Sequence, residues 1–275
     1  MKKLLIITGP TASGKTAEAV RLAQEFDTEI LSCDSRQFYR EMNIGVARPS
    51  EEELAAARHH FIACRSVTEP YNIFDYERDA MALLESLFQC HEIVIAVGGS
   101  GLYVDALRLG VTSMLDPTPE LRARLQQMPI EEKRAQLQLL DPDYYARVDL
   151  RNPMRLQRAL EVCYMTGRPY SQVVAEWKPA ERPFDIEVRV LQPPTSDLRN
   201  RIDRRVDRMM SDGLLDEVWS LLAYRHLNTL NTVGYRELFP VIDGTANLSD
   251  AVAQIKLNTW HYARKQLTWM RKYSH

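Results

Sequence analysis

A phosphate-binding loop near the N-terminus constrains this chain more than any other feature. Residues 9–16, GPTASGKT, match the pattern G-x-x-x-x-G-K-[S/T]. An apolar run at 3–8 precedes the loop and a helical pattern over 14–26 follows it, which is the context that the motif requires. In such a loop the backbone N–H groups and the helix N-terminus face an anion. The sequence therefore predicts a site for a diphosphate or polyphosphate.

Side chains of the loop add to this backbone cradle. Lys15 supplies a positive charge beside the phosphates, and the Thr16 hydroxyl is the predicted ligand of Mg²⁺, the expected cofactor. The other residues predicted to contact the phosphates are Gly9, Thr11, Ala12, Ser13 and Gly14.

One part of the usual P-loop machinery is missing from the pattern. P-loop NTPases commonly help to hold Mg²⁺ with an acid at the end of another strand. The strand expected at 92–97 runs into Gly98 and Gly99 without an acid, whereas the strand expected at 29–33 ends at Asp34. Ligands gather at the carboxyl ends of strands in open α/β sheets, so Asp34 is a candidate for chemistry, with a turn or helix cap as the alternative.

The hydrophobic pattern predicts an α/β fold with a P-loop NTPase-like parallel sheet. Continuous apolar runs alternate with helical patterns, which is typical of a doubly wound sheet whose strands are buried on both faces. The predicted strands are 3–8, 29–33, 92–97 and 184–191, and the clearest helices are 14–26 and 74–90. From 196 to the end, the sequence is predicted to be helical throughout.

The stretch 117–182 has a different pattern. It contains no strand candidate, and prolines bound it at both ends. We predict a helical insert domain here, with 1–116 and 183–275 forming the P-loop α/β core and its C-terminal helices.

The composition is that of a globular protein, with 45% apolar residues among 275 and a formal net charge of −2. No run approaches the roughly 20 apolar residues of a membrane span, and the N-terminal run from Leu4 to Ile7 is too short for a signal peptide. We therefore expect a cytoplasmic protein that does not bind a membrane. The four cysteines lack C-x-x-C spacing, which predicts small buried side chains and neither a zinc ribbon nor a disulfide framework.

The near-zero net charge argues against a protein that coats nucleic acid by charge alone. Basic residues are nevertheless concentrated locally. Residues 251–275 contain five lysines and arginines and no Asp or Glu. Two pairs repeat at seven residues, so a helix here would have a basic face; a solvated terminal helix is the alternative. Trp260 and Trp269 in this stretch are predicted to belong to the core.

Two further arginine patterns have helical spacing. Arginines at 201, 204, 205 and 208 share one helix face, beside a separate apolar stripe. They either bind phosphate or form a solvated face paired with Asp203 and Asp207, and both interpretations remain open. In the predicted insert, Asn152 and Pro153 are expected to begin a helix in which Arg151, Arg155 and Arg158 are placed together.

Seven blocks, in order, resemble the tRNA dimethylallyltransferase family. They are GPTASGKT at 9, DSRQFYREMNIGVARPS at 34, VGGSGLYVDAL at 97, NPMRLQRALEV at 152, RRVDRMMSDGLLDEV at 204, TVGYREL at 232 and ARKQLTWMR at 263. The resemblance covers nearly the whole chain and departs from the family in two places. Ser100 stands where the family usually has Thr, and the chain ends soon after the last block, so we expect a terminal segment to be missing or truncated.

The resemblance implies a prenyl transfer. The N6 amine of adenine would attack C1 of dimethylallyl diphosphate, and diphosphate would leave. By this resemblance Asp34 is the general base, Arg205 stabilises the leaving group, and Ser100 hydrogen-bonds the reacting amine or the diphosphate. For Ser100, a turn between glycines is the alternative suggested by the sequence.

The resemblance also implies the acceptor, which is the adenosine immediately 3′ of the anticodon in a tRNA anticodon stem-loop. The enzyme is expected to act as a monomer. The residues expected to contact tRNA are Ser35, Arg36, Gln37, Arg122, Met154, Arg155, Leu156, Gln157, Arg158, Gly234, Tyr235, Arg264, Lys265, Gln266 and Arg271. Ser35 and Gln37, next to Asp34, are expected to read the edge of a flipped base.

Two other functions share part of the pattern. A P-loop small-molecule kinase would have the same loop and sheet, but it would bind ATP and usually carry an acid near 92–97. In a non-catalytic RNA-binding protein, neither the phosphate-binding Lys15 nor the strand-end Asp34 would have a function. Preference for ATP or for dimethylallyl diphosphate would distinguish the first alternative from the transferase.

Overall fold

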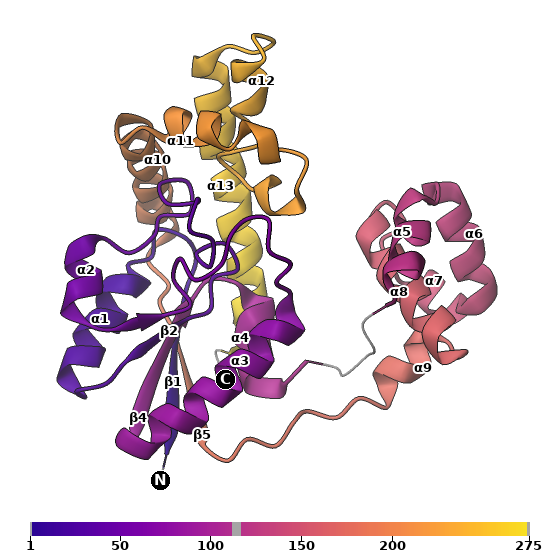
Figure 1. Ribbon diagram of the computed structural model, residues 1–275, viewed down its shortest axis with the longest axis horizontal. Coiled ribbons are helices and arrows are strands. Elements are labelled where there is room, and N and C mark those ends of the chain that lie inside the picture. The colour runs from indigo at the N-terminus through magenta and orange to yellow at the C-terminus, as the bar shows by residue number, and fades with distance from the viewer. Residues whose placement is uncertain (1, 112–116, 274–275) are drawn as a thin grey trace. The chain divides into compact units, whose positions relative to one another are not determined.

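The computed structural model describes residues 2–111 and 117–273, and the chain divides into two compact units (Figure 1). The first unit comprises Met1–Gly110 and Glu181–His275, and the second comprises Val111–Ala180. The second unit overlaps the stretch that we predicted as the insert, 117–182. The first unit contains the sheet, and the second is helical in its described residues.

A five-stranded parallel sheet forms the centre of the first unit. Its strands are β1 (Lys3–Thr8), β2 (Ile30–Ser32), β3 (His59–His60), β4 (Ile93–Gly98) and β5 (Asp185–Val190). They are hydrogen-bonded in the order β3-β2-β4-β1-β5. The four predicted strands are therefore present within one or two residues. The two-residue strand β3 was not predicted, because a pair of histidines gives no strand signal.

The interior strand β1 is buried on both faces, which explains its continuous apolar sequence. Successive side chains of a strand point to opposite faces of the sheet. In β1, Leu4 and Ile6 belong to one core cluster, whereas Leu5 and Ile7 belong to the other. Helix α1 (Lys15–Glu25) covers the second cluster, and α3 (Ile73–Cys90) packs against the first.

The remaining helices of the first unit follow the strands as connections or lie after the last strand. They are α2 (Glu51–Ala56), α4 (Gly101–Leu109), α10 (Thr195–Ser211), α11 (Leu214–Ser220), α12 (Phe239–Ile242) and α13 (Leu248–Met270). Local sequence sets several of their starts. For α3, Asn72 accepts hydrogen bonds at the first turn while the Asp75 side chain accepts one from the Asn72 N–H, a reciprocal capping box.

The prediction of continuous helix after residue 196 was wrong for the region between α11 and α13. This region contains two short 3-10 turns, Leu222–Tyr224 and Asn228–Leu230, the short helix α12, and loops. Gly234 and Gly244 there adopt positive φ angles of 102° and 73°, which end helical geometry.

The second unit is a small bundle with its own core. Its helices are α5 (Pro119–Gln127), α6 (Ile130–Leu140), α7 (Pro142–Tyr145), α8 (Pro153–Thr166) and α9 (Tyr170–Ala175). Buried Leu125, Leu137, Leu156 and Leu160 pack together in its centre. As predicted, Asn152 and Pro153 begin α8, and the Asn152 side chain accepts a hydrogen bond from the N–H of Arg155.

The four cysteines are free, and only two of them fit the expected burial. Cys33 and Cys163 are buried, but Cys64 is half-buried and Cys90 is exposed at the end of α3. Among the residues that the structure describes, no helix combines the length and apolar character that a membrane crossing requires.

Candidate active site

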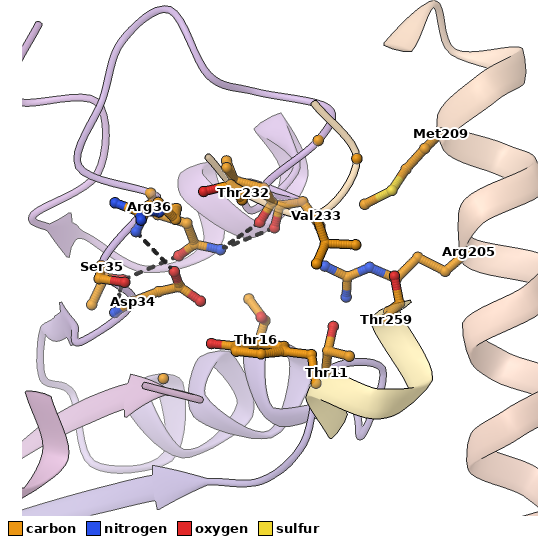
Figure 2. Close-up of a pocket in the computed structure, with 18 of the residues that line it drawn as sticks. Thr11, Thr16, Asp34, Ser35, Arg36, Arg205, Met209, Thr232, Val233 and Thr259 are labelled. Carbon is orange, nitrogen blue, oxygen red and sulfur yellow. Dashed lines mark hydrogen bonds between the residues drawn. The ribbon is translucent and has the colours of Figure 1, made fainter. Parts of the chain in front are cut away.

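A cavity of about 400 Å³ lies at the carboxyl ends of the strands in the first unit (Figure 2). The phosphate loop and the turn after β2 form part of its wall. The loops 45–49 and 231–236 and one face each of α10 and α13 form the rest. Its charged lining residues are Lys15, Asp34, Arg36, Arg205 and Arg236. In the described part of the chain, one carboxylate therefore shares the cavity with four basic side chains.

Close packing shapes the phosphate loop between β1 and α1. A Cβ atom added to Gly9 would lie 2.6 Å from the carbonyl oxygen of Leu191, so only glycine fits there. Gly14 has a φ of 90°, which glycine adopts without strain. The Thr8 hydroxyl donates to the Gly98 carbonyl at 2.8 Å and joins the last residue of β1, just before the loop, to the last residue of β4. The predicted strand–loop–helix context is confirmed.

Lys15 is held within the loop beside Arg205. Its ammonium group donates to the carbonyl oxygen of Pro10 at 3.0 Å. Burial and the positive charge of Arg205 lower the pKa of Lys15 from 10.5 to about 8, although the nearby carboxylate of Asp34 acts in the opposite direction. An anion bound here would stabilise the charged form of Lys15 and raise this pKa again.

Gln266 connects the phosphate loop to the glycine turn after β4. Its Oε1 accepts from the N–H of Thr11, and its Nε2 donates to the carbonyl of Gly99, both at 2.8 Å. A Cβ atom at Gly99 would lie 2.4 Å from Nε2, which explains the glycine. We expected Gln266 to contact tRNA, but its side chain is buried and engaged inside the protein.

Two roles were considered for Asp34, a structural role in a turn and a chemical role in the site. It takes part in the turn after β2 and also lines the cavity. Its Oδ1 accepts from the N–H of Arg36 at 3.0 Å, and its own N–H donates to the Ser32 hydroxyl at 3.3 Å. In Figure 2 its carboxylate lies on one side of the cavity and the Arg205 guanidinium on the other, with Thr11 and Thr16 between them. The turn thus fixes one oxygen and aims the carboxylate at the cavity.

Ser100 lies next to this turn as the N-cap residue of α4. Its hydroxyl accepts from the N–H of Ser35 at 3.3 Å and is 3.4 Å from the Ser35 hydroxyl. It also bonds the hydroxyl of Tyr262 on α13, whose pKa burial and the nearby Asp34 raise to about 12. The hydroxyl of serine is therefore sufficient for these contacts, although the family usually has threonine here.

Arg205 differs from the other arginines that we grouped on one face of α10 in its burial and in its contact with the cavity. The predicted apolar stripe of that helix is Leu198, Ile202, Val206 and Met209, of which the first three are buried and Met209 is partly buried. Arg205 is partly buried and lines the cavity, whereas the arginines at 201, 204 and 208 are exposed. Burial lowers the pKa of Arg205, and Asp34 counteracts this shift. The four-arginine stripe therefore does not act as one surface.

Gln37 is oriented by the protein itself. Its Nε2 donates to the carbonyl of Ala47 at 3.0 Å and lies 3.4 Å from that of Val46. Its Oε1 accepts from the Ser32 hydroxyl at 3.1 Å. Gln37 thereby joins the 45–49 loop to the end of β2. Its Oε1 keeps one further lone pair for a ligand.

Several lining residues were missed from the sequence. They are Met209 on α10, Asn231, Thr232, Val233 and Arg236 in the loop before α12, and Ile255, Thr259 and Tyr262 on α13. The predicted Gly234 also lines the cavity, but Tyr235 is buried and donates to the carboxylate of Glu217. One signal was present: 255, 259, 262 and 266 have the spacing of a single helix face.

The basic end of the chain is only partly available for RNA. Lys256 pairs with Asp207 at 2.6 Å, and Lys272 binds Asp105 on α4. The side chains of Arg264, Lys265 and Arg271 are exposed, and no ion pair is formed by them within 2–111 and 117–273.

The two tryptophans of this stretch lie near the protein surface. Trp269 is 41% exposed, although it donates to Asp105 and covers Gly101, so its assignment to the core was wrong. Trp260 is half-buried beside α10.

In the second unit, the residues predicted to contact tRNA differ in exposure. Met154 is 65% exposed, and Arg155 and Arg122 are exposed as well. Leu156 is in the core. Two other predicted contacts, Gln157 and Arg158, bond the buried Glu161 on the same helix. Exposed residues of this set remain candidates for RNA, whereas the buried ones stabilise α8.

The cavity offers oxygen ligands for the expected Mg²⁺. Thr16 and Asp34 both line it, and hydroxyl and carboxylate oxygens are the donors that Mg²⁺ prefers, together with waters and phosphates. In the described part of the chain, no group of three or more His, Cys, Asp or Glu side chains could hold a metal ion by itself. The residues present thus suit a metal that arrives with a phosphate ligand.

Known proteins with sequences similar to this chain match it over nearly its whole length. A protein that is 45% identical over 276 residues is tRNA dimethylallyltransferase 1 of Bacteroides thetaiotaomicron, with 99% of this chain and 89% of that protein covered. The tRNA dimethylallyltransferase of Christiangramia forsetii is also 45% identical, over 98% of this chain and 90% of its own length.

Solved structures agree. The tRNA isopentenylpyrophosphate transferase of Bacillus halodurans is 31% identical with a TM-score of 0.71, and 98% of this chain and 87% of that chain are covered. A eukaryotic dimethylallyltransferase acting on tRNA has a TM-score of 0.84 at 27% identity, over 98% of this chain and 70% of that one. The family model for IPP transferase matches residues 37–273. The chain therefore belongs to the IPP transferase family.

Proposed function

We propose that this protein transfers a dimethylallyl group from dimethylallyl diphosphate to N6 of the adenosine immediately 3′ of the anticodon in tRNA. The observation that carries the proposal is Asp34, which among the described residues is the one carboxylate that lines the cavity, beside a phosphate loop and four basic side chains. The tRNA dimethylallyltransferases similar to this chain support it. A small-molecule kinase is disfavoured by the family relationship.

The donor diphosphate would bind at the phosphate loop. Negative charge grows on the diphosphate as its bond to C1 breaks, and fixed positive groups stabilise that charge most effectively in a partly buried site. Lys15 and Arg205 are both at the cavity wall and partly buried. Thr16 would hold Mg²⁺, which when bound supplies further neutralisation of the diphosphate oxygens.

Asp34 would accept the proton that the amine loses. As N6 forms its bond to C1, the nitrogen becomes cationic and its proton becomes acidic. A carboxylate that one hydrogen bond already orients is a suitable acceptor, and general bases typically contribute about 10²–10⁴-fold. The phosphate loop and Asp34 line the same cavity, which allows donor and acceptor to meet there.

The adenine must leave its stack to reach such a cavity, because the reacting atom has to contact Asp34. Single-stranded loops are where RNA bases can be splayed out and read. Gln37 Oε1 and the hydroxyl of Ser35 are the polar groups next to Asp34 that would contact the base edge. Exposed basic residues at Arg264, Lys265 and Arg271 would contact phosphates of the stem-loop, and those of the second unit would add to them.

Three anticodon stem-loops test the proposal. Labelled dimethylallyl diphosphate and Mg²⁺ are incubated with the parent stem-loop, with one in which the target adenosine is guanosine, and with one in which the flanking adenines are replaced. We expect labelling of the parent and none of the guanosine variant, because guanosine has no N6 amine. Equal labelling of all three would refute reading of the loop. Preferential binding of ATP over dimethylallyl diphosphate would favour a small-molecule kinase. The protein is expected to act as a monomer in the cytoplasm, where tRNA is available.

A further inference from the structure

Glu217 lies outside the cavity but binds two segments that form its walls. Its Oε2 accepts from the backbone N–H groups of Asn43 at 3.1 Å and Ile44 at 2.7 Å. Its Oε1 accepts from the N–H of Gly45 at 3.0 Å and from the hydroxyl of Tyr235 at 2.6 Å. Three successive N–H groups that converge on one carboxylate form an anion-binding nest. Both oxygens of Glu217 are thus used as acceptors only.

The two bound segments continue directly into cavity-lining residues. After Gly45, residues 46 and 47 line the cavity, and before Tyr235 the stretch 232–234 lines it from another direction. The two segments also touch each other. A Cβ atom at Gly45 would lie 2.4 Å from the Tyr235 ring, so this contact requires glycine. Neither Glu217 nor Tyr235 lines the cavity, so any effect on the reaction is indirect.

A chain of hydrogen bonds leads from the first segment to the candidate base. The carbonyl of Ala47 accepts from Gln37 Nε2, and Gln37 Oε1 accepts from the Ser32 hydroxyl. That hydroxyl in turn accepts from the N–H of Asp34. Displacement of the 43–47 segment would therefore change the orientation of Gln37 and of the turn that carries Asp34.

We infer that Glu217 is a positioning residue for the acceptor side of the reaction: it fixes the 43–47 and 232–235 segments and thereby sets the pocket in which the acceptor base meets Asp34. The inference rests on the proposed function, which assigns the phosphate loop to the donor and the Asp34 side to the base. A displacement of about 1 Å can lower the rate about a hundredfold, so loss of the carboxylate should be visible in turnover.

Glu217→Gln removes the charge with almost no change in volume. At the Oε2 position the NH₂ group would meet only the N–H donors of Asn43 and Ile44. At the Oε1 position it would lose the Gly45 N–H bond, although the Tyr235 hydroxyl could turn to accept from it, so at least one hydrogen bond is lost in either orientation. Tyr235→Phe removes one of the four bonds and leaves the rest. Asp216→Asn is the matched control, because Asp216 is the exposed neighbour on the same helix turn and is not bonded to either segment in the described hydrogen bonds.

The assay compares kcat/KM for the stem-loop with the dissociation constant for dimethylallyl diphosphate. We expect Glu217→Gln to lower kcat/KM for the stem-loop by about ten- to a hundredfold and to change donor affinity less than twofold. Tyr235→Phe should act in the same direction with a smaller effect, and Asp216→Asn should equal the parent. The double variant should be less impaired than the product of the single effects, because both act through one contact.

A purely structural role would lower the melting temperature without changing acceptor kinetics relative to donor binding. The inference would be overturned if folded Glu217→Gln kept the parent's kcat/KM for the stem-loop. It would also be overturned if donor affinity fell by the same factor as that kcat/KM. If Glu217→Gln does not fold, Tyr235→Phe decides by the same ratio. Absence of any transfer by the parent protein would overturn the proposed function, and this inference with it.

Discussion

The charge of Lys15 should make donor binding depend on pH in a range where most lysines do not titrate. Burial and Arg205 lower the pKa of Lys15 to about 8 in the free protein. A bound diphosphate favours the protonated form, so it raises this pKa. Above pH 8, binding must therefore take up a proton, and affinity should fall as the pH rises. Well below pH 8, Lys15 is already charged and affinity should be level.

The expected size of the effect follows from the fraction of protonated Lys15. With a pKa of about 8, that fraction falls from roughly nine-tenths at pH 7 to roughly one-tenth at pH 9, so the dissociation constant should rise about tenfold. A lysine with the ordinary value of 10.5 would give almost no change over the same interval.

Isothermal titration with dimethylallyl diphosphate at fixed Mg²⁺ between pH 7 and 9 measures this profile. Lys15→Arg is the informative control, because a guanidinium stays protonated throughout and the slope should disappear even if affinity is lower. Lys15→Met should bind weakly at all these pH values, also without a slope. A flat profile for the parent, or an equal slope in Lys15→Arg, would refute the assignment of the titrating group.

Three further outcomes can be measured. Asp34→Asn keeps an oxygen for the turn but loses the base, so single-turnover transfer should fall about 10²–10⁴-fold while stem-loop affinity stays within a few fold; a rate within threefold of the parent would remove Asp34 from the mechanism. Arg264→Ala and Lys265→Ala should each weaken stem-loop binding and reduce the slope of log affinity against log salt by roughly one, and a flat parent profile would contradict an electrostatic surface. Gly98→Ala places a Cβ 2.6 Å from the Cys33 carbonyl, so urea unfolding should show a loss of about 1–3 kcal/mol.

The parts predicted from sequence are those with a local signal. Continuous apolar runs give the strands because each strand is buried on both faces, and the glycine-rich motif gives the loop because backbone geometry defines it. Asp34 was a candidate because it follows a strand, and the resemblance to the family supplied its predicted role as the base. By contrast, the cavity wall at 231–236 has no periodic pattern. Its conformation depends on Gly234 and on the buried Glu237, which accepts from the Gly234 N–H, from Arg236 and from Asn258.

Some of the residues predicted to contact RNA are exposed and others are buried, and residue type alone does not distinguish the two groups. Tyr235 and Gln266 have side chains that commonly contact RNA, yet both are buried and bonded within the protein. Sequence similarity identifies positions that matter, but it does not separate a residue that touches the substrate from one that holds a loop. The distinction required the hydrogen-bond partners, each of which is far away in the sequence.

Helix α13 illustrates why one half of a site can be predicted and the other half missed. Thr259, Tyr262 and Gln266 share the face that meets the cavity and the phosphate loop, whereas Arg264 and Arg271 are on the opposite face. The basic face stands out because like charges repeat without neighbouring acids. The cavity face consists of neutral polar and aromatic residues, which are equally compatible with an ordinary partly buried helix. Because the two faces belong to one rigid helix, a stem-loop bound to the arginines would act on the same element that holds the Thr11 N–H through Gln266.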